Sequence, residues 1–328
     1  MSGLHKFLFE GLPVRGMVVR LTDAWTEILR RRAGNSETGA DPQPVRALLG
    51  EMTAASVLMQ ASIQFNGALV MQIFGDGPVK VAVTEVQSDL RLRATAKVVG
   101  EVAADASLSQ LVNLNNQGRC AITLDPTDKL PGQQPYQSLV PLYGDHHEKL
   151  EALSSVLEHY MLQSQQIDTT LVLASNDGVA AGLLIQRLPL EGAGNLSGGR
   201  DHRNEDEIGI NEDFNRISIL AKSLTAQELL TLDVDTVLHR LFWDEKLLRY
   251  PPITGESGPR FECSCSRERV SRMLVGLGRA EADSIIAERD LIEVGCDFCG
   301  RQYRFDAVDT AQVFTDAGNQ PPSTTAVQ

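Results

Sequence analysis

Four cysteines near the C-terminus have the residue type and spacing for metal chemistry. One residue separates Cys263 from Cys265, two separate Cys296 from Cys299, and positions 266–295 lie between the two pairs. Zinc prefers a tetrahedron of soft or borderline ligands, and two close cysteine pairs supply it in many all-cysteine sites. The pattern therefore predicts one Zn²⁺ per chain, held by these four thiolates.

The spacing alone leaves the role of such a site open. Most all-cysteine zinc sites are structural, so spacing by itself favours a static zinc ribbon, as in a nucleic-acid-binding or regulatory protein. The 43 acidic and 30 basic residues give a formal net charge of −13, which disfavours a phosphate backbone as partner. A thiol-disulfide oxidoreductase using Cys296 and Cys299 is a second alternative, although that motif normally opens a helix after a strand. No other arrangement indicates a catalytic residue, so we predict that the chain is not an enzyme.

The two cysteine pairs differ in how easily each could close a disulfide. Joining Cys263 to Cys265 closes a tighter and more strained ring than joining Cys296 to Cys299. An oxidant would therefore form Cys296–Cys299 first and weaken the hold on the metal. A module this small buries little apolar surface, so loss of the ion would unfold it.

The residues around the cysteines predict the elements that position them. Positions 267–277 and 281–288 are typical of short helices, and 291–294 of a strand leading into the second pair. Gly295 and Gly300 flank that pair and permit a tight turn. Tyr303 and Phe305 follow and could supply a small core.

The first 190 residues predict an α+β domain. Apolar residues recur at helical spacing over 44–64 and alternate over 69–73, 79–83, 90–98 and 120–124. In the 90–98 segment the alternating partners are polar, which makes it the clearest half-buried strand. Asp145 is predicted to cap a helix that carries Leu150 through Met161, and a turn over 175–178 predicts a hairpin. Meandering strands with few helices favour α+β layers over a doubly wound parallel sheet.

The chain changes character after residue 190. Residues 191–213 are rich in Gly, Asn and charge and predict a loop, whereas 214–249 predict helices, with a capping box at Thr225 and Glu228. We predict a core domain at 1–190, a loop and helical linker at 191–260, a zinc module at 261–316 and a disordered tail at 317–328. The linker carries an apolar stripe that consists of Val234, Val237, Leu238, Leu241 and Phe242.

Other features favour no additional site. Cys120 lies on an alternating segment and is predicted to be a buried small hydrophobe. His146 and His147 lack zinc spacing and suggest a solvated helix end, and the glycines of 192–199 lack the lysine of a phosphate loop. No secretory signal or membrane-spanning window is visible, so a cytoplasmic protein without membrane or nucleic-acid partners is expected.

Several short motifs lie in order along nearly the whole chain. The motifs are Val14-Arg-Gly16, Gly75-Asp-Gly-Pro78, Gly100-Glu101, Glu228-Leu-Leu-Thr-Leu232, Val237-Leu-His-Arg-Leu241, Cys263-Ser-Cys265-Ser-Arg-Glu-Arg269, Asp283-Ser-Ile-Ile-Ala-Glu288 and Gly295-Cys-Asp-Phe-Cys-Gly300. With these motifs the chain resembles the heat-shock protein 33 family of redox-regulated chaperones. The cysteine motifs and their spacing are the most specific part of this resemblance.

The resemblance implies a mechanism as well as a fold. It implies an α+β N-terminal domain, a helical linker and a C-terminal zinc domain, inactive as a chaperone while reduced and zinc-bound. Oxidation would form Cys263–Cys265 and Cys296–Cys299, release zinc and unfold the zinc domain and linker. The active form, usually a homodimer, would hold unfolding client proteins without ATP, before thiol-reducing systems and ATP-dependent chaperones take over. The apolar stripe of the linker is a candidate client contact, because detachment would expose it.

Overall fold

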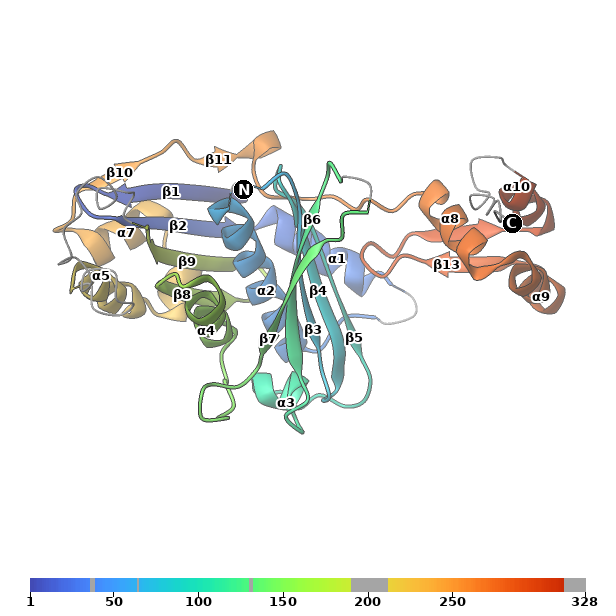
Figure 1. Cartoon of the computed structure of the whole chain (residues 1–328), viewed down its shortest axis with the longest axis horizontal. Coiled ribbons are helices and arrows are strands. Elements are labelled where there is room, and N and C mark those ends of the chain that lie inside the picture. Colours follow the sequence, from blue (N-terminus) through green and yellow to red (C-terminus); the bar gives the residue numbers. More distant parts are fainter. Residues whose placement is uncertain (36–38, 64, 130–131, 190–211, 316–328) are drawn as a thin grey trace, which may run out of the picture.

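Two sheets form the body of the molecule (Figure 1). The structure, a computed structural model, describes residues 1–35, 39–63, 65–129, 132–189 and 212–315. In the first sheet, sheet A, the strand order is β10-β1-β2-β9-β8, with β11 also paired to β1. Its strands are β1 (Gly3–Phe9), β2 (Val14–Leu21), β8 (Thr169–Ser175), β9 (Ala180–Arg187), β10 (Leu247–Arg249) and β11 (Ile253–Thr254).

The second sheet, sheet B, has the order β12-β5-β4-β3-β6-β7. All its neighbouring strands are antiparallel except β12, which runs parallel to β5. Its strands are β3 (Gly67–Phe74), β4 (Val79–Gln87), β5 (Arg91–Val98), β6 (Arg119–Pro126), β7 (Tyr136–Pro141) and β12 (Arg260–Phe261). The predicted α+β class and the predicted strands of the N-terminal half are confirmed.

Helix α2 (Gln43–Ser62) lies between the two sheets and forms the centre of the larger core (Figure 1). Buried residues occur all round this helix, from Val45 to Gln60, as expected where both sides pack against a sheet. The remaining helices of this half border the sheets: α1 (Asp23–Ala33), α3 (Leu108–Val112) and α4 (Leu153–Gln165).

The predicted start of α4 is wrong. Residues 143–149 form a tight loop in which the Gly144 amide donates to the Glu148 carbonyl at 2.9 Å. His147 has φ +60°, a left-handed conformation that a right-handed helix cannot contain. Asp145 therefore caps no helix, and α4 begins only at Leu153.

Three linker helices cover the face of sheet A that points away from α2. They are α5 (Glu212–Lys222), α6 (Ala226–Thr231) and α7 (Val234–Phe242). The capping box at Thr225 and Glu228 is present at the start of α6. The alternation of strand side chains serves both cores: in β1, Leu4 belongs to the α2 core, whereas Phe7 and Phe9 pack against the linker.

The helical prediction for 214–249 is wrong beyond Phe242. Asp233 caps α7 by accepting from the Thr236 amide at 2.9 Å, and the chain then becomes extended. It runs as β10 and β11 along β1, through a short 3₁₀ turn at Gly255–Ser257, and as β12 along β5. The segment after α7 thus joins both sheets of the body.

The C-terminal module lies at the far end of the molecule from the linker helices (Figure 1). It consists of α8 (Arg267–Leu277), α9 (Arg279–Arg289), β13 (Ile292–Gly295), β14 (Gln302–Phe305) and α10 (Ala307–Thr315). The two helices and the strand predicted between the cysteine pairs are confirmed. The division at 190, 260 and 316 remains a prediction, and the predicted loop and tail fall largely outside the described residues.

Candidate metal centre

Backbone hydrogen bonds position both cysteine pairs. Strand β12 ends at Phe261 and delivers Cys263 and Cys265 to the centre. The second pair occupies the turn between β13 and β14, where the Gly300 amide donates to the Cys296 carbonyl at 2.8 Å. Gly300 has φ +70°, a conformation that favours a residue without a side chain. The tight turn that we predicted from this glycine is therefore present.

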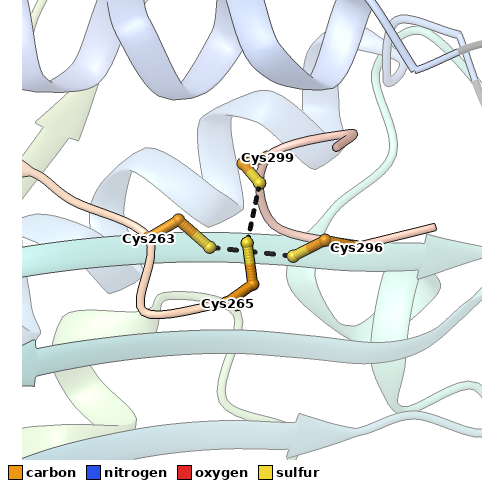
Figure 2. Close-up of side chains that lie close together, drawn as sticks. All are labelled: Cys263, Cys265, Cys296 and Cys299. Carbon is orange, nitrogen blue, oxygen red and sulfur yellow. Dashed lines mark hydrogen bonds between the residues drawn. The ribbon is translucent and has the colours of Figure 1, made fainter. Parts of the chain in front are cut away.

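The four sulfurs converge on one point, as Figure 2 shows. All lie within 4.8 Å of one another. Two contacts cross between the pairs: 3.7 Å from Cys263 Sγ to Cys296 Sγ and 3.4 Å from Cys265 Sγ to Cys299 Sγ. A tetrahedral ion with metal–sulfur bonds of about 2.3 Å requires sulfurs about 3.8 Å apart. The four donors therefore fit a tetrahedral metal ion, and soft thiolates suit Zn²⁺.

Hydrogen bonds within the cluster perturb its thiols. The bond donated by Cys296 lowers the pKa of the Cys263 thiol well below its ordinary value, and the same bond raises the pKa of Cys296. Burial raises the pKa of Cys299 to about 11. The Tyr303 hydroxyl donates to Cys265 Sγ at 3.1 Å, which stabilises charge on that sulfur. This second role of Tyr303, beyond its predicted place in the core, was not visible in the sequence.

The module has only a small core of its own. Its buried apolar members include the predicted Tyr303 and Phe305, 7% and 0% exposed. The complete set is Val270, Leu274, Ala282, Ile292, Tyr303, Phe305 and Val313. Such a core is small for independent folding, so the sulfur cluster must contribute to holding the module together.

The predicted apolar stripe is buried on sheet A. Its five residues are between 2% and 9% exposed, and the Phe242 ring stacks edge-on against Phe9 at 5.0 Å. Arg20 of β2 holds the preceding turn by donating to the carbonyls of Leu229, Leu230 and Leu232. The stripe packs as an amphipathic helix should, but α7 is not a neighbour of the cysteine module (Figure 1).

The structure also places the other residues that the sequence analysis singled out. Cys120 is fully buried in β6, and burial raises its pKa to about 12. His146 and His147 lie in the loop before α4 rather than at a helix end. The glycines of 192–199 lie outside the described residues. No described helix is long and apolar enough to cross a bilayer.

The fold and site define an α+β protein with an appended four-thiol module, and relatives of this class are known. A family model described as Hsp33 protein matches residues 2–306. The 33 kDa chaperonin of Chromobacterium violaceum is 42% identical over 311 residues, which cover 95% of this chain and 93% of the relative. That of Methylobacillus flagellatus is 39% identical over 315 residues, which cover 95% and 94%.

A solved structure shares the fold. The crystal structure of a 33 kDa chaperonin from Thermotoga maritima superposes with a TM-score of 0.70 at 19% identity, over 96% of this chain and 98% of that one. The chain belongs to the Hsp33 family. Its relatives are named as chaperonins, which are not enzymes, in agreement with the prediction that this chain is not an enzyme.

Proposed function

We propose that this protein is a redox-regulated, ATP-independent chaperone that holds unfolding proteins after its thiols are oxidised. The observation that carries the proposal is the convergence of four sulfurs within 4.8 Å, in a module with little core of its own. Family membership supports the chaperone role. A reducing cytoplasm would keep the thiols in their resting state, and a homodimer would be the active form.

In the resting state Cys263, Cys265, Cys296 and Cys299 would hold one Zn²⁺. The ion supplies four bonds that tie the two pairs together and keeps the sulfurs as thiolates, which are the reactive form. Each pair of sulfurs then gives two electrons to one peroxide molecule. Each pair becomes a disulfide, and each peroxide takes up two protons and leaves as two waters. Sulfurs joined in this way no longer bind the ion, and the module loses its main support.

The order of the two disulfides follows from ring size. Cys296 and Cys299 close the easier ring and should pair first, and Cys263–Cys265 should follow after local unfolding. Trapping free thiols at intervals during oxidation, followed by peptide mapping, measures the order. Early closure of Cys263–Cys265, or a bond from Cys263 to Cys296 across their 3.7 Å contact, would contradict it.

Release of the module must reach the linker through the extended segment β10–β12, since α7 lies at the opposite end of the molecule. Unpairing of this segment from β1 would remove its support from the linker. Detachment of α5–α7 would then expose the stripe on α7 and the apolar face of sheet A beneath it, and such surfaces bind unfolding chains. Thiol-reducing systems and ATP-dependent chaperones would then take over the clients.

The test is to treat zinc-loaded protein with peroxide at mild heat while following zinc release and the aggregation of an unfolding client. We expect zinc release and suppression of aggregation to rise together. Unchanged client aggregation after zinc has left would refute the holdase. Retention of DNA would instead favour a static nucleic-acid-binding ribbon, and turnover of a disulfide substrate an oxidoreductase. Cys120→Ala, which leaves all four clustered sulfurs in place, is the matched control.

A further inference from the structure

The outward face of β5 contacts the cysteine module, although its sequence pattern is typical of a solvated strand face. Arg91, Arg93 and Thr95 point away from the core, between the buried Leu92 and Ala94 and beyond. Each of the three meets the module or the strand that leads into it. Solubility alone therefore does not explain the polar residues on this face of β5.

Strand β12 determines where the cysteine module meets β5. It adds to β5 in parallel over only two residues, with Arg260 opposite Arg91 and Phe261 opposite Leu92. The Arg260 amide donates to the Leu90 carbonyl at 3.2 Å and the Glu262 amide to the Leu92 carbonyl at 3.1 Å. The next residue is Cys263, so this register places the first cysteine beside Arg93.

Arg93 is held between the body and the module. Its Nη2 pairs with Glu85 at 2.6 Å, and both side chains are only 15% exposed. Its Nη1 lies 3.9 Å from Cys263 Sγ, and its guanidinium carbon lies 4.2 Å from the ring centroid of Phe298. One cation thus contacts both cysteine pairs, through a sulfur of the first and an aromatic ring inside the second.

The backbone of the second pair is held as well. The Asp297 carbonyl accepts from Thr95 Oγ1 at 3.0 Å and from Arg32 Nη1 at 3.3 Å. Arg32 is 4% exposed and is itself fixed by an ion pair with Asp41. The turn between Cys296 and Cys299 therefore sits on a preorganised pair of donors.

We propose that the outward face of β5 is a docking surface that holds the module through the negative charge of its sulfurs, with Arg93 as the positioning residue. The proposal rests on the proposed function for that charge. Four thiolates and one divalent cation carry a net −2, opposite a half-buried guanidinium. After two peroxides have taken up four electrons and four protons and left as four waters, and the cation has gone, two neutral disulfides face the same guanidinium. The attraction is then lost, and β12 is kept on β5 by two backbone hydrogen bonds and by the surface ion pairs Arg91–Glu262 and Arg260–Asp89.

The test uses the full chain, reduced and zinc-loaded, without oxidant or client. Hydrogen exchange at the Arg260 and Glu262 amides reports docking, whereas exchange at the Gly300 amide reports integrity of the module. In Arg93→Gln we expect the two docking amides to exchange about 10-fold faster, the factor that about 1.4 kcal/mol gives, with Gly300 unchanged. Arg93→Lys, which keeps the charge, should stay closer to the wild type. Lys97→Gln, an exposed cation on the same face, is the matched control and should change nothing.

Exchange in Arg93→Gln within twofold of the wild type at both docking amides would overturn the proposal. So would equal loosening by Lys97→Gln. If Arg93→Gln does not fold, Phe298→Ala removes the ring from the module side, and wild-type exchange at Glu262 in that variant would also overturn it. Since no oxidant or client is present, a failure of the holdase assay would leave this result unaffected, and the two failures remain distinguishable.

Discussion

Each clustered sulfur contacts another across the two pairs, so the loss of one should weaken the whole centre. In Cys296→Ser a hard hydroxyl replaces the thiolate that faces Cys263 at 3.7 Å. We expect zinc affinity to fall by more than ~100-fold and the module to become protease-sensitive. A chromogenic chelator competition and limited proteolysis measure these effects. Unchanged zinc stoichiometry with unchanged protease resistance would reject the assignment, and Cys120→Ala should behave as the wild type.

A second residue-scale prediction concerns Glu51 of α2, which borders a cavity of about 310 Å³. Burial raises the pKa of Glu51 to about 7 from its model-peptide value of 4.5. Between pH 4.5 and 7 the native state therefore binds more protons than the unfolded state, so the free energy of unfolding falls as pH rises through this window. Glu51→Gln should gain on the order of 2–3 kcal/mol relative to the wild type at pH 8 and little at pH 4.5.

Urea unfolding of the wild type and of Glu51→Gln at pH 4.5 and pH 8 tests this. The contributions of the other titrating groups cancel when the free energies of unfolding of the two proteins are subtracted at each pH. Glu151 borders the same cavity, but its hydrogen bonds, among them one from the Ser109 amide at 3.2 Å, outweigh desolvation and lower its pKa. Glu151→Gln should therefore lose stability at pH 8. An equal increase in the free energy of unfolding of Glu51→Gln at both pH values would contradict the raised pKa of Glu51.

At this scale the sequence predicted the convergence of the four cysteines better than the contacts around them. Cysteine type and spacing are local, and so are the glycine turn at Gly300 and the burial of Cys120. The contacts of Arg93 and Arg32 with the second pair join residues more than 200 positions apart, and only the β5–β12 register brings them together. A polar residue on an alternating strand gives no sign of which surface will cover it.

At the scale of the elements, we predict that the apolar stripe of α7 contacts client proteins. Leu238 and Leu241 are 2% and 3% exposed on sheet A. Changing both to serine should lower the free energy of unfolding by roughly 2–5 kcal/mol at each site, because packing is lost. It should also reduce client capture by the oxidised protein, because the exposed stripe would be less apolar. An aggregation assay with oxidised protein measures this. Ile219→Ser on α5, whose side chain is already 71% exposed, should leave capture unchanged. Equal capture by the double variant and the wild type would exclude the stripe as a client contact.

Periodicity identified α2 and strands β3–β6, but we predicted no element before residue 44, where β1, β2 and α1 lie, and none of the short strands β10–β12. Strands β10, β11 and β12 have only two or three residues each, and β11 and β12 adjoin Pro or Gly, so they show no clear pattern. The start of α4 failed for a different reason, because the left-handed His147 is set by its loop. Short strands form through partners already in place, which a local pattern cannot reveal.

At the scale of the whole molecule, stability should be unevenly distributed. The body has two extensive cores around α2 and beneath α7, while the core of the module, as far as the structure describes it, has seven buried members. Removing the metal by chelation under reducing conditions should therefore raise hydrogen exchange throughout α8–α10 while α2 stays protected. Exchange read by mass spectrometry over both regions measures this. Unchanged protection of α8–α10 in metal-free protein would show that the module folds on its own core.

The separation of the module from α7 could not be predicted, because it depends on how the chain from 243 to 261 runs over the body. The predicted domain bounds say nothing of how far the module lies from the linker helix. In the structure sheets A and B lie between them, and the extended segment β10–β12 runs along both sheets (Figure 1). Its backbone pairing with β1 and β5 therefore offers a route of communication between the two ends.

Strand β12 also hides a sheet edge. While it is paired, the amides of Arg260 and of the following Glu262 donate to the carbonyls of Leu90, just before β5, and of Leu92 on β5. Once it leaves, those carbonyls become an open edge, which an extended chain of any sequence can join through its own backbone amides. Recognition by main-chain pairing needs no particular side chain. The departure of two residues would thus give the body a sequence-independent means of binding unfolded polypeptide on sheet B, at the opposite end of the body from the apolar face of sheet A that the linker covers.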